Sequence, residues 1–156
     1  IKKKALMIKF NVILNNSKWL NNLRNPTIYI ERKINKLNKK RNIFRNKIVY
    51  CSLLLSGDKE IKKLNEKFRG KKKTTDVLSF PFYEKIELKS QLKINKEIYL
   101  GDIIVNYNKI KNRNFKIEFD KLWIHGLTHL LGHDHKKDKD FYNMRNIEKK
   151  FLSYIK

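Results

Sequence analysis

The chain is poor in cysteine and has no long apolar run, and both absences restrict where it can work. Cys51 is its single cysteine, so no disulfide can form within the chain, which indicates a reducing compartment. Because Cys51 lies inside an apolar run, we expect it to be a small buried core residue. No segment approaches the ~20 apolar residues that a membrane-spanning helix needs. Lys9 cuts the apolar start too short for a signal peptide, and Met7 is the alternative to Ile1 as the true first residue. The sequence therefore predicts a cytoplasmic protein with no membrane partner.

Acidic residues are scarce as well. The 156 residues include 38 Lys and Arg but only 15 Asp and Glu, which gives a formal net charge of +23 and a pI near 10.1. A field of this sign attracts polyanions, so nucleic acid is the first candidate partner. Codon usage in an A/T-rich genome would also produce a chain full of Lys, Asn and Ile without selection for binding. Charge alone therefore leaves both explanations open.

Histidine is absent from the chain except for residues 125–135, which hold all four. His125 and His129 are four residues apart, so on a helix both imidazoles project from one face. Gly132 can end or bend that helix because glycine adopts positive φ at no steric cost, and the bend returns His135 toward the pair. Three imidazoles that converge on one point, with a fourth position for water, are typical of a catalytic zinc site. The sequence thus predicts one zinc ion bound by His125, His129 and His135, against a chance cluster or a purely structural hydrogen-bonded group.

The segment from residue 125 to 135 also matches the zinc residues of the metzincin pattern H-E-x-x-H-x-x-G-x-x-H. Gly126, however, stands where a zinc protease has the Glu that serves as general base. The metal triad is present and the protease base is absent, which favours zinc chemistry other than standard peptide hydrolysis.

Two further residues of this segment are out of register with the three predicted ligands. We expect His133 to be a solvent-facing turn residue rather than a proton shuttle. Asp134 is expected to hydrogen-bond the backbone of the turn or the second nitrogen of a ligand histidine, and not to bind the metal itself.

Hydrophobic periodicity predicts an α+β fold of about four strands packed with about five helices. The expected strands cover residues 7–14, 47–56, 76–82 and 98–105. One expected helix begins at Pro26, others cover about 107–114 and 117–131, and two more are capped by Asp58 and by Asp138. Pro81 places the third strand at or near a sheet edge, and Gly70 ends the helix before it. Residues 83–97 are polar and without pattern, so we expect a mobile loop there. We find no repeat and no linker, and residues 1–156 are predicted to form a single domain.

Three ordered motifs resemble the signatures of the YbeY family, metal-dependent endoribonucleases that mature ribosomal RNA. HGLTHLLGHDH is similar to the family pattern H-G-x-x-H-L-x-G-Y-D-H. The second signature is resembled by LNEKFRGK at 64–71 with TDVLSFP at 75–81, and the third by LGDII at 100–104. The chain departs from the family at His133, Thr74 and Phe68, and none of these departures removes a proposed ligand. The resemblance runs from the first strand to the final helix.

The resemblance implies a mixed four-stranded sheet, zinc bound by the three histidines, and cleavage of single-stranded RNA in precursor ribosomal RNA. It also implies a role in processing the 3′ end of the small-subunit rRNA and in ribosome quality control, with the small ribosomal subunit as partner. Arg69 is implied as a catalytic or substrate-anchoring residue.

The chemistry of phosphodiester cleavage agrees with these roles. A zinc ion can polarise a phosphoryl oxygen and lower the pKa of its water toward ~7. A guanidinium fork matches two phosphate oxygens, which suits Arg69, although a cation at a helix C-terminus is also favoured by the helix dipole alone. The nucleophile is open between metal-bound water and a ribose 2′-hydroxyl. Asp76 and Asp102 are expected to cap or orient, with no catalytic role.

Two other functions would use the same histidines. A zinc peptidase is disfavoured by Gly126 and by the basic surface, which offers no advantage for a neutral peptide. A ribosome-assembly protein with a structural zinc would need a fourth protein ligand, which only His133 or Asp134 could supply.

Overall fold

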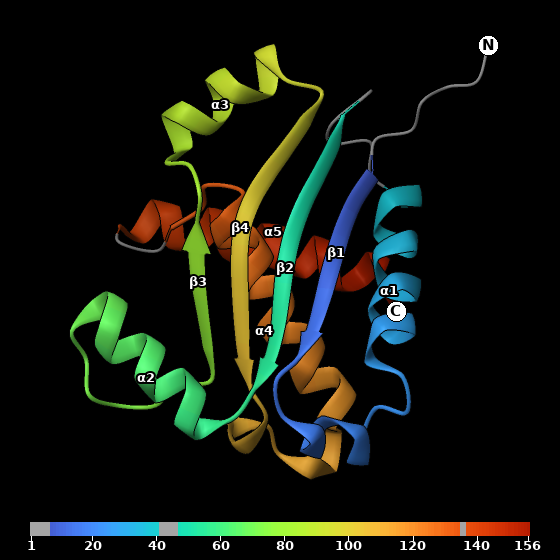
Figure 1. Cartoon of the computed structure of the whole chain (residues 1–156). Coiled ribbons are helices and arrows are strands. Elements are labelled where there is room, and N and C mark those ends of the chain that lie inside the picture. The colour runs from blue at the N-terminus through green and yellow to red at the C-terminus, as the bar shows by residue number, and fades with distance from the viewer. Residues whose placement is uncertain (1–6, 41–46, 135–136) are drawn as a thin grey trace.

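The computed structural model describes residues 7–40, 47–134 and 137–156, which form one sheet flanked by helices (Figure 1). The strands are β1 (Met7–Leu14), β2 (Ile48–Ser56), β3 (Val77–Pro81) and β4 (Glu97–Asn106). The α-helices are α1 (Pro26–Lys40), α2 (Asp58–Arg69), α3 (Lys85–Ile94), α4 (Phe115–Leu130) and α5 (Asp138–Tyr154). The connections contain the 3-10 helices η1 (Ser17–Asn21), η2 (Tyr107–Lys109) and η3 (Asn112–Asn114). His135 and the alternative start Ile1 lie outside the described residues.

The four strands form a mixed sheet in the order β1-β2-β4-β3. β1, β2 and β4 run parallel, and β3 is antiparallel to β4. Parallel neighbours need a crossover connection, which α1 supplies between β1 and β2. β3 is an edge strand, as Pro81 predicted, so the missing N–H of the proline interrupts no second ladder. The predicted α+β fold, with about four strands and five α-helices, is confirmed.

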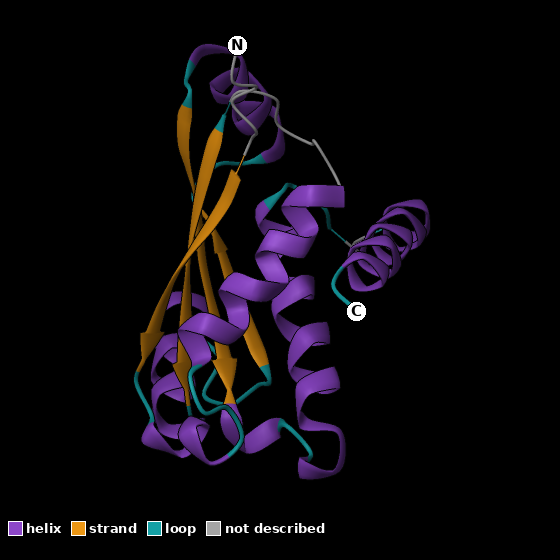
Figure 2. Cartoon of the chain, turned by 90° about the vertical axis from the view of Figure 1, so that its right-hand side faces the viewer, coloured by secondary structure: helices purple, strands orange, loops and turns teal. Residues whose placement is uncertain are grey.

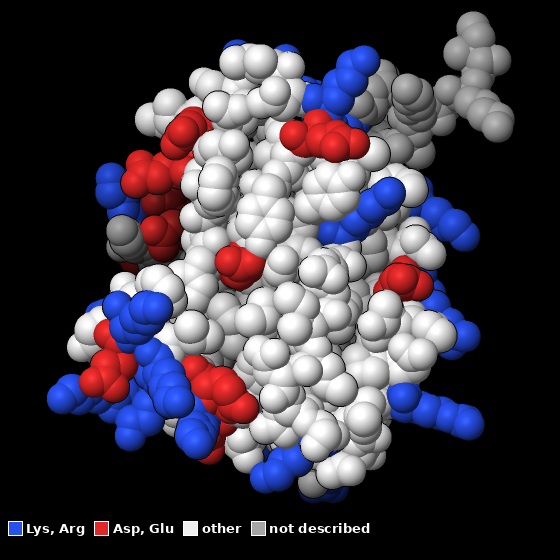
Figure 3. All heavy atoms as spheres, viewed as in Figure 1, with Lys and Arg blue, Asp and Glu red and all other residues white. Residues whose placement is uncertain are grey.

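The helices leave one face of the sheet partly open. α1 and α4 pack on the other face, and α5 lies on their outer side (Figure 2). Between this helical layer and the sheet, Trp19, Phe119 and Trp123 are fully buried. α2 covers part of the opposite face through a small cluster around Ile61. The centre of that face carries few charged side chains (Figure 3).

β4 contains a β-bulge at the glycine of the LGD motif. Tyr50 of β2 pairs with Tyr99 and Cys51 pairs with Gly101, so Leu100 is the extra residue of the bulge and has no partner in β2. Gly101 has a φ of +138°, and a Cβ there would lie 2.2 Å from the carbonyl oxygen of Phe80 on β3. Only glycine fits both demands. The residues of β4 that belong to the main core are therefore even-numbered before the bulge and odd-numbered after it, at 98, 100, 103 and 105.

The predicted strands and the helices beginning near Pro26 and Asp58 are confirmed to within a few residues, as are those near 117–131 and 138. Gly70 ends α2 in the left-handed conformation, with a φ of +64°. Cys51 is buried, with 1% of its surface exposed. No helix in the described parts of the chain is long and apolar enough to cross a membrane.

Three local predictions are wrong. Residues 85–94 form α3 rather than a mobile loop, and they gave no helical pattern because only Leu88 is buried while Ile86 and Ile94 are exposed. The segment 107–114 forms η2 and η3 instead of one helix. Asp58 and Asp138 are the first helical residues and not the caps, because Gly57 and Lys137 occupy the N-cap positions.

The side chain of Asp58 belongs instead to a polar junction at the end of β4. The fully buried Asn106 amide nitrogen lies 2.7 Å from the Asp58 carboxylate, 2.9 Å from the Thr74 hydroxyl and 3.0 Å from the Thr75 carbonyl. Thr74 donates to the same carboxylate at 3.0 Å. The pKa of Asp58 is held below its ordinary value, chiefly by the hydrogen bond from Asn106. The junction fastens the start of α2 to the sheet.

α4 approaches β4 at a second glycine. Gly126 is buried, and a Cβ at this position would lie 2.6 Å from Cγ2 of Ile103. Real carbon atoms do not approach so closely without moving, so this helix–sheet distance requires glycine. Position 126 points into the core between helix and sheet.

We expect Gly126→Ala to lower the free energy of unfolding by about 1–3 kcal/mol, because the added methyl overpacks the contact with Ile103. This loss would occur although alanine favours a helix by about 1 kcal/mol over glycine. Urea unfolding followed by circular dichroism measures the difference. In a double-mutant cycle with Ile103→Ala, the second alanine should cost less than it does alone. Stability equal to that of the unmodified protein would show that the contact is not tight.

The Asp58 junction predicts a pH dependence. A carboxyl whose folded pKa is lowered stabilises the fold above its unfolded pKa of about 3.9, and the contribution is lost as the pH falls through the folded pKa. We expect Asn106→Ser to raise the pKa of Asp58 toward its ordinary value, measured by NMR titration. Asp58→Asn should flatten the acid limb of the stability curve. If the pKa of Asp58 is unchanged in Asn106→Ser, the amide is not what holds it low.

Candidate metal and phosphate site

The histidine pair lies on the last turns of α4. This helix is apolar on most of its surface, with Phe119, Trp123 and Leu127 fully buried. The buried residues and the contact of Gly126 with β4 fix its rotation about its own axis. His125 and His129, one turn apart, consequently face away from the sheet, toward α5 and the turn that follows α4.

The two imidazoles converge through their Nε2 atoms, which lie 3.2 Å apart. The rings are nearly perpendicular, with an interplanar angle of 87° and centroids 4.7 Å apart. About a third of the His125 side chain, 33%, is exposed, so the pair is reachable from solvent.

The Nδ1 atom of each ring has an oxygen partner that fixes the ring. His125 Nδ1 lies 2.8 Å from Oε1 of Glu148 on α5. His129 Nδ1 lies 3.0 Å from the backbone carbonyl oxygen of His133. A carbonyl oxygen only accepts, and a carboxylate does so too, so Nδ1 is the donor of each ring in the singly protonated tautomer that this geometry favours. Each Nε2 then presents a lone pair to the other.

Two lone pairs at this separation repel unless a proton or a cation lies between them. Nitrogens bound to zinc at ~2.0–2.1 Å in tetrahedral geometry lie about 3.3 Å apart, close to the observed 3.2 Å. Nδ1–H donated to a carboxylate or a carbonyl is also the usual way in which proteins orient a metal-binding histidine. The described residues therefore fit two of the three predicted zinc ligands.

The turn after α4 supplies the carbonyl partner. Gly132 adopts a φ of +93°, as its position after the helix predicted. Its N–H donates to the His129 carbonyl at 3.0 Å, and the N–H of His133 donates to that of Thr128 at 3.2 Å. This cap brings the His133 backbone carbonyl to the His129 ring. The sequence prediction considered only the side chain of His133 and missed this role of its backbone.

The third predicted ligand, His135, lies outside the described residues. Within the described ranges, no group of three His, Cys, Asp or Glu side chains is placed to hold a metal. Glu148 was not foreseen from the sequence, because it is separated from His125 by 23 positions and lies on another helix. In the sequence, Glu148 stands out only as an acidic residue between Ile147 and two lysines.

Arg69, at the C-terminal end of α2, reaches the edge strand β3. Its Nη2 donates to the Ser79 carbonyl at 2.9 Å, and its guanidinium carbon lies 5.6 Å from the centre of the Phe80 ring. α4 packs against the same strand. One of five N–H groups is used by Ser79, and the side chain is exposed. Arg69 and the histidine helix therefore both contact β3.

The two aspartates for which no catalytic role is predicted lie elsewhere. The Asp102 carboxylate is hydrogen-bonded to the Tyr99 hydroxyl on the open face of the sheet, and Tyr99 also contacts Ser52. The Asp76 backbone carbonyl accepts from the Asn106 N–H at 2.8 Å, beside the α2 junction. Basic side chains gather over α2 and the loop after it (Figure 3).

Comparisons with known proteins identify a family and several relatives. The family model described as Endoribonuclease YbeY matches residues 14–156. The chain is 43% identical to the Endoribonuclease YbeY of Pelagibacter ubique (strain HTCC1062), covering 96% of this chain and 97% of that one. It is 35% identical to the protein of the same name from Thermodesulfovibrio yellowstonii, over 81% and 77% of the two chains.

A solved structure is similar as well. A solution structure of a Thermotoga maritima protein superposes with a TM-score of 0.53 at 27% sequence identity, and covers 96% of this chain and 89% of that one. The family model and the relatives carry the same description. The chain belongs to the YbeY family of endoribonucleases, enzymes that cut RNA internally.

Proposed function

We propose that this chain is a zinc-dependent endoribonuclease in which His125, His129 and His135 hold one zinc ion. The observation that carries the metal is the Nε2 pair of His125 and His129 at 3.2 Å, with both Nδ1 atoms paired to oxygens. The metal-free alternative is a doubly protonated ring that donates from one Nε2 to the other. A hydrogen bond between the two rings would not explain why the pair is accessible to solvent in a family of nucleases.

The chain's own residues have separate tasks in this proposal. Glu148 and the His133 carbonyl are positioning groups, because they hold the two rings and act only through them. Arg69 binds the scissile phosphate, where its planar fork matches two oxygens. When bound, zinc would polarise a phosphoryl oxygen or activate the nucleophile. Gly126 rules out a protease-type base at that position, since its Cβ direction points at Ile103 and not at the histidines.

The substrate we propose is single-stranded RNA within precursor ribosomal RNA, cut in the cytoplasm during maturation of the 3′ end of the small-subunit rRNA. The small ribosomal subunit and a part in ribosome quality control belong to the same proposal. It is supported by the family membership and by the net charge of +23, which attracts a polyanion.

The central test uses labelled single-stranded RNA and casein, each with and without chelator. We expect the zinc-loaded chain to cut RNA only, and chelator to stop cleavage. His129→Ala should lose most of the bound zinc and the cleavage, since it loses a ligand. Zinc is measured by elemental analysis after dialysis. A terminal cyclic phosphate on the product would assign the attack to the ribose 2′-hydroxyl.

His133→Ala is the matched control for that test, because the backbone carbonyl that supports His129 remains. It should keep both zinc and cleavage. Equal zinc content in His129→Ala and His133→Ala would remove the ligand assignment. Casein cleavage that is stronger than RNA cleavage would make a peptidase the better conclusion.

Arg69 is tested by separating its charge from its shape. We expect both Arg69→Ala and Arg69→Lys to lose most RNA cleavage, at least about 10-fold, because lysine keeps the charge but lacks the two-pronged fork. Zinc content should stay at the unmodified level, which distinguishes phosphate binding from damage to the metal site. Single-turnover cleavage rates at saturating enzyme provide the measurement. Normal cleavage by Arg69→Lys would reduce Arg69 to one more surface charge.

A further inference from the structure

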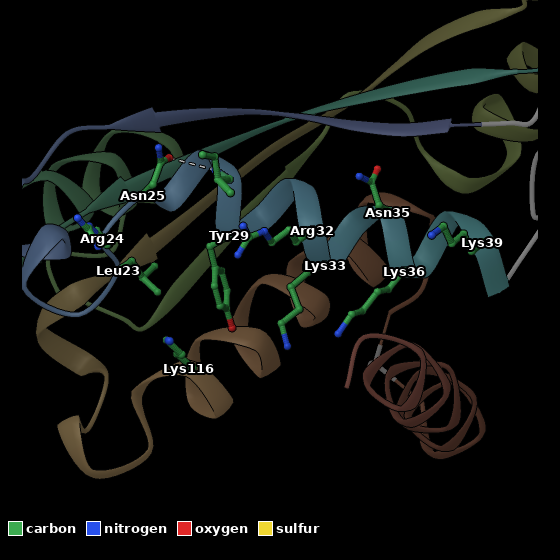
Figure 4. Close-up of a pocket in the computed structure, with 11 residues that line it drawn as sticks. Leu23, Arg24, Asn25, Tyr29, Arg32, Lys33, Asn35, Lys36, Lys39 and Lys116 are labelled. Carbon is green, nitrogen blue, oxygen red and sulfur yellow. Dashed lines mark hydrogen bonds between the residues drawn. The ribbon is translucent and has the colours of Figure 1, made fainter.

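A large groove lies along α1, away from the histidine pair. It has a volume of about 1020 Å³ and is lined by residues of α1, by the segment before it and by Lys116 at the start of α4. Tyr29, Lys33 and Lys36 point from α1 toward α4 and α5, while Lys116 approaches from the opposite side (Figure 4). His125 and His129 follow Lys116 by nine and 13 positions on the same helix, which corresponds to about 14 and 20 Å along its axis.

The lining of the groove is strongly cationic. Six of its residues are basic, and no Asp or Glu of the described chain is among them: Arg24, Arg32, Lys33, Lys36, Lys39 and Lys116. Arg32, Lys36 and Lys39 follow one another at helical spacing, so that they form a row about 10 Å long on one side of α1. Like charges at this spacing repel one another, so the row does not stabilise the helix in the free protein.

One buried acid, Asp120, contacts two of the lining residues without itself lining the groove. The Asp120 carboxylate accepts hydrogen bonds from the Tyr29 hydroxyl and from Nε1 of Trp123, both at 2.9 Å, and lies 3.2 Å from Nζ of Lys33. Burial raises the pKa of Tyr29, and the neighbouring Asp120 carboxylate raises it further, so Tyr29 stays a neutral donor. The Tyr29 ring lies between two ammonium groups, 5.6 Å from Lys33 and 5.9 Å from Lys116.

Asp120 neutralises the charge of only one of the cations that line the groove. Asp120 is already matched by Lys33, the only lining cation with a salt bridge among the described residues. Nζ of Lys33 and of Lys36 also donate to the carbonyls of Ile155 and Lys156, each at 2.9 Å, and so tie α1 to the end of the chain. Of the other lining cations, Arg24, Arg32, Lys39 and Lys116 are exposed to a ligand.

The arrangement selects for a polymer of negative charge. A small anion would require donors that converge on one point, whereas these cations are spread along the groove and come from two helices. We propose that this groove binds the phosphate backbone of the RNA outside the cleavage site, without reading its sequence. The inference rests on the proposed function only in taking RNA as the partner.

The test compares two charge-matched variants. Arg32→Gln/Lys39→Gln/Lys116→Gln neutralises the groove, and Lys89→Gln/Lys93→Gln/Lys96→Gln removes as many exposed charges on and beside α3. Binding is measured with single-stranded RNA of about 30 nucleotides, and with single-stranded DNA of the same length as a backbone that an endoribonuclease does not cut. We expect the groove variant to bind at least about 10-fold more weakly, with a log–log salt slope reduced by up to ~2. The α3 variant should keep most of its affinity.

Crosslinking locates the contact directly. Cys51 is the only native cysteine, it is buried, and burial raises the pKa of its thiol, so an introduced surface cysteine can be labelled alone. Arg32→Cys carrying a photoreactive group should crosslink the RNA, whereas Lys93→Cys should do so weakly. Equal losses in the two triple variants, or equal crosslinking from both cysteines, would overturn the inference. If Arg32→Cys crosslinks more strongly to polyglutamate than to RNA, the groove binds an acidic protein and the inference is wrong.

The outcome separates this inference from the proposed function. A chain that crosslinks RNA in the groove but never cuts it would disprove the nuclease assignment and leave the groove intact. If the chain cuts RNA but RNA crosslinks to the groove no more than to α3, the nuclease assignment stands and the groove inference is wrong.

Discussion

The close packing of α4 against β4 is the constraint on which the site depends. At Gly126 a Cβ would lie 2.6 Å from Cγ2 of Ile103, so a larger residue would require the helix or the Ile103 side chain to move. With the helix at this distance and its large apolar residues in the core, only one rotation about its axis remains. That rotation turns His125 and His129 toward Glu148 and the Gly132 turn. The same glycine leaves no place for a protease-type base, so one position decides both the packing and the class of chemistry.

Carboxylates are scarce in this chain, and several of them hold elements together. Asp120 on α4 joins this helix to α1 through Tyr29 and Lys33. Glu148 joins α5 to the histidine helix, and Asp58 joins α2 to the end of β4. Partly buried hydrogen bonds of this kind are stronger than those in water, because the surroundings screen them less. With only 15 acids against 38 bases, most bases cannot be paired one to one with an acid, and this excess strengthens the field felt by a polyanion.

Positive charge is distributed unevenly over the surface. The centre of the open sheet face carries few charged groups, while basic side chains gather over α2 and its following loop (Figure 3) and along the groove of α1 (Figure 4). The two basic regions differ in kind. Arg69 is held by Ser79 and Phe80 in one orientation, which suits a directional contact with a single phosphate. The cations of the groove lie in a row on exposed side chains, which suits sequence-independent contact with many phosphates.

The sequence by itself determined the features that depend on near neighbours. The i, i+4 spacing of His125 and His129, the positive φ of Gly132, the edge position of β3 from Pro81 and most strands and helices could all be predicted, because periodicity and glycine or proline chemistry act over a few residues. α3 could not, since a helix with one buried residue leaves almost no periodic signal.

Only the tertiary structure decided which distant groups meet. Glu148 finds His125 across 23 positions, Asp120 finds Tyr29 across 91, and Gly126 meets Ile103 on another element. Such partners depend on how helices rotate and pack on the sheet, and local spacing carries no record of that rotation.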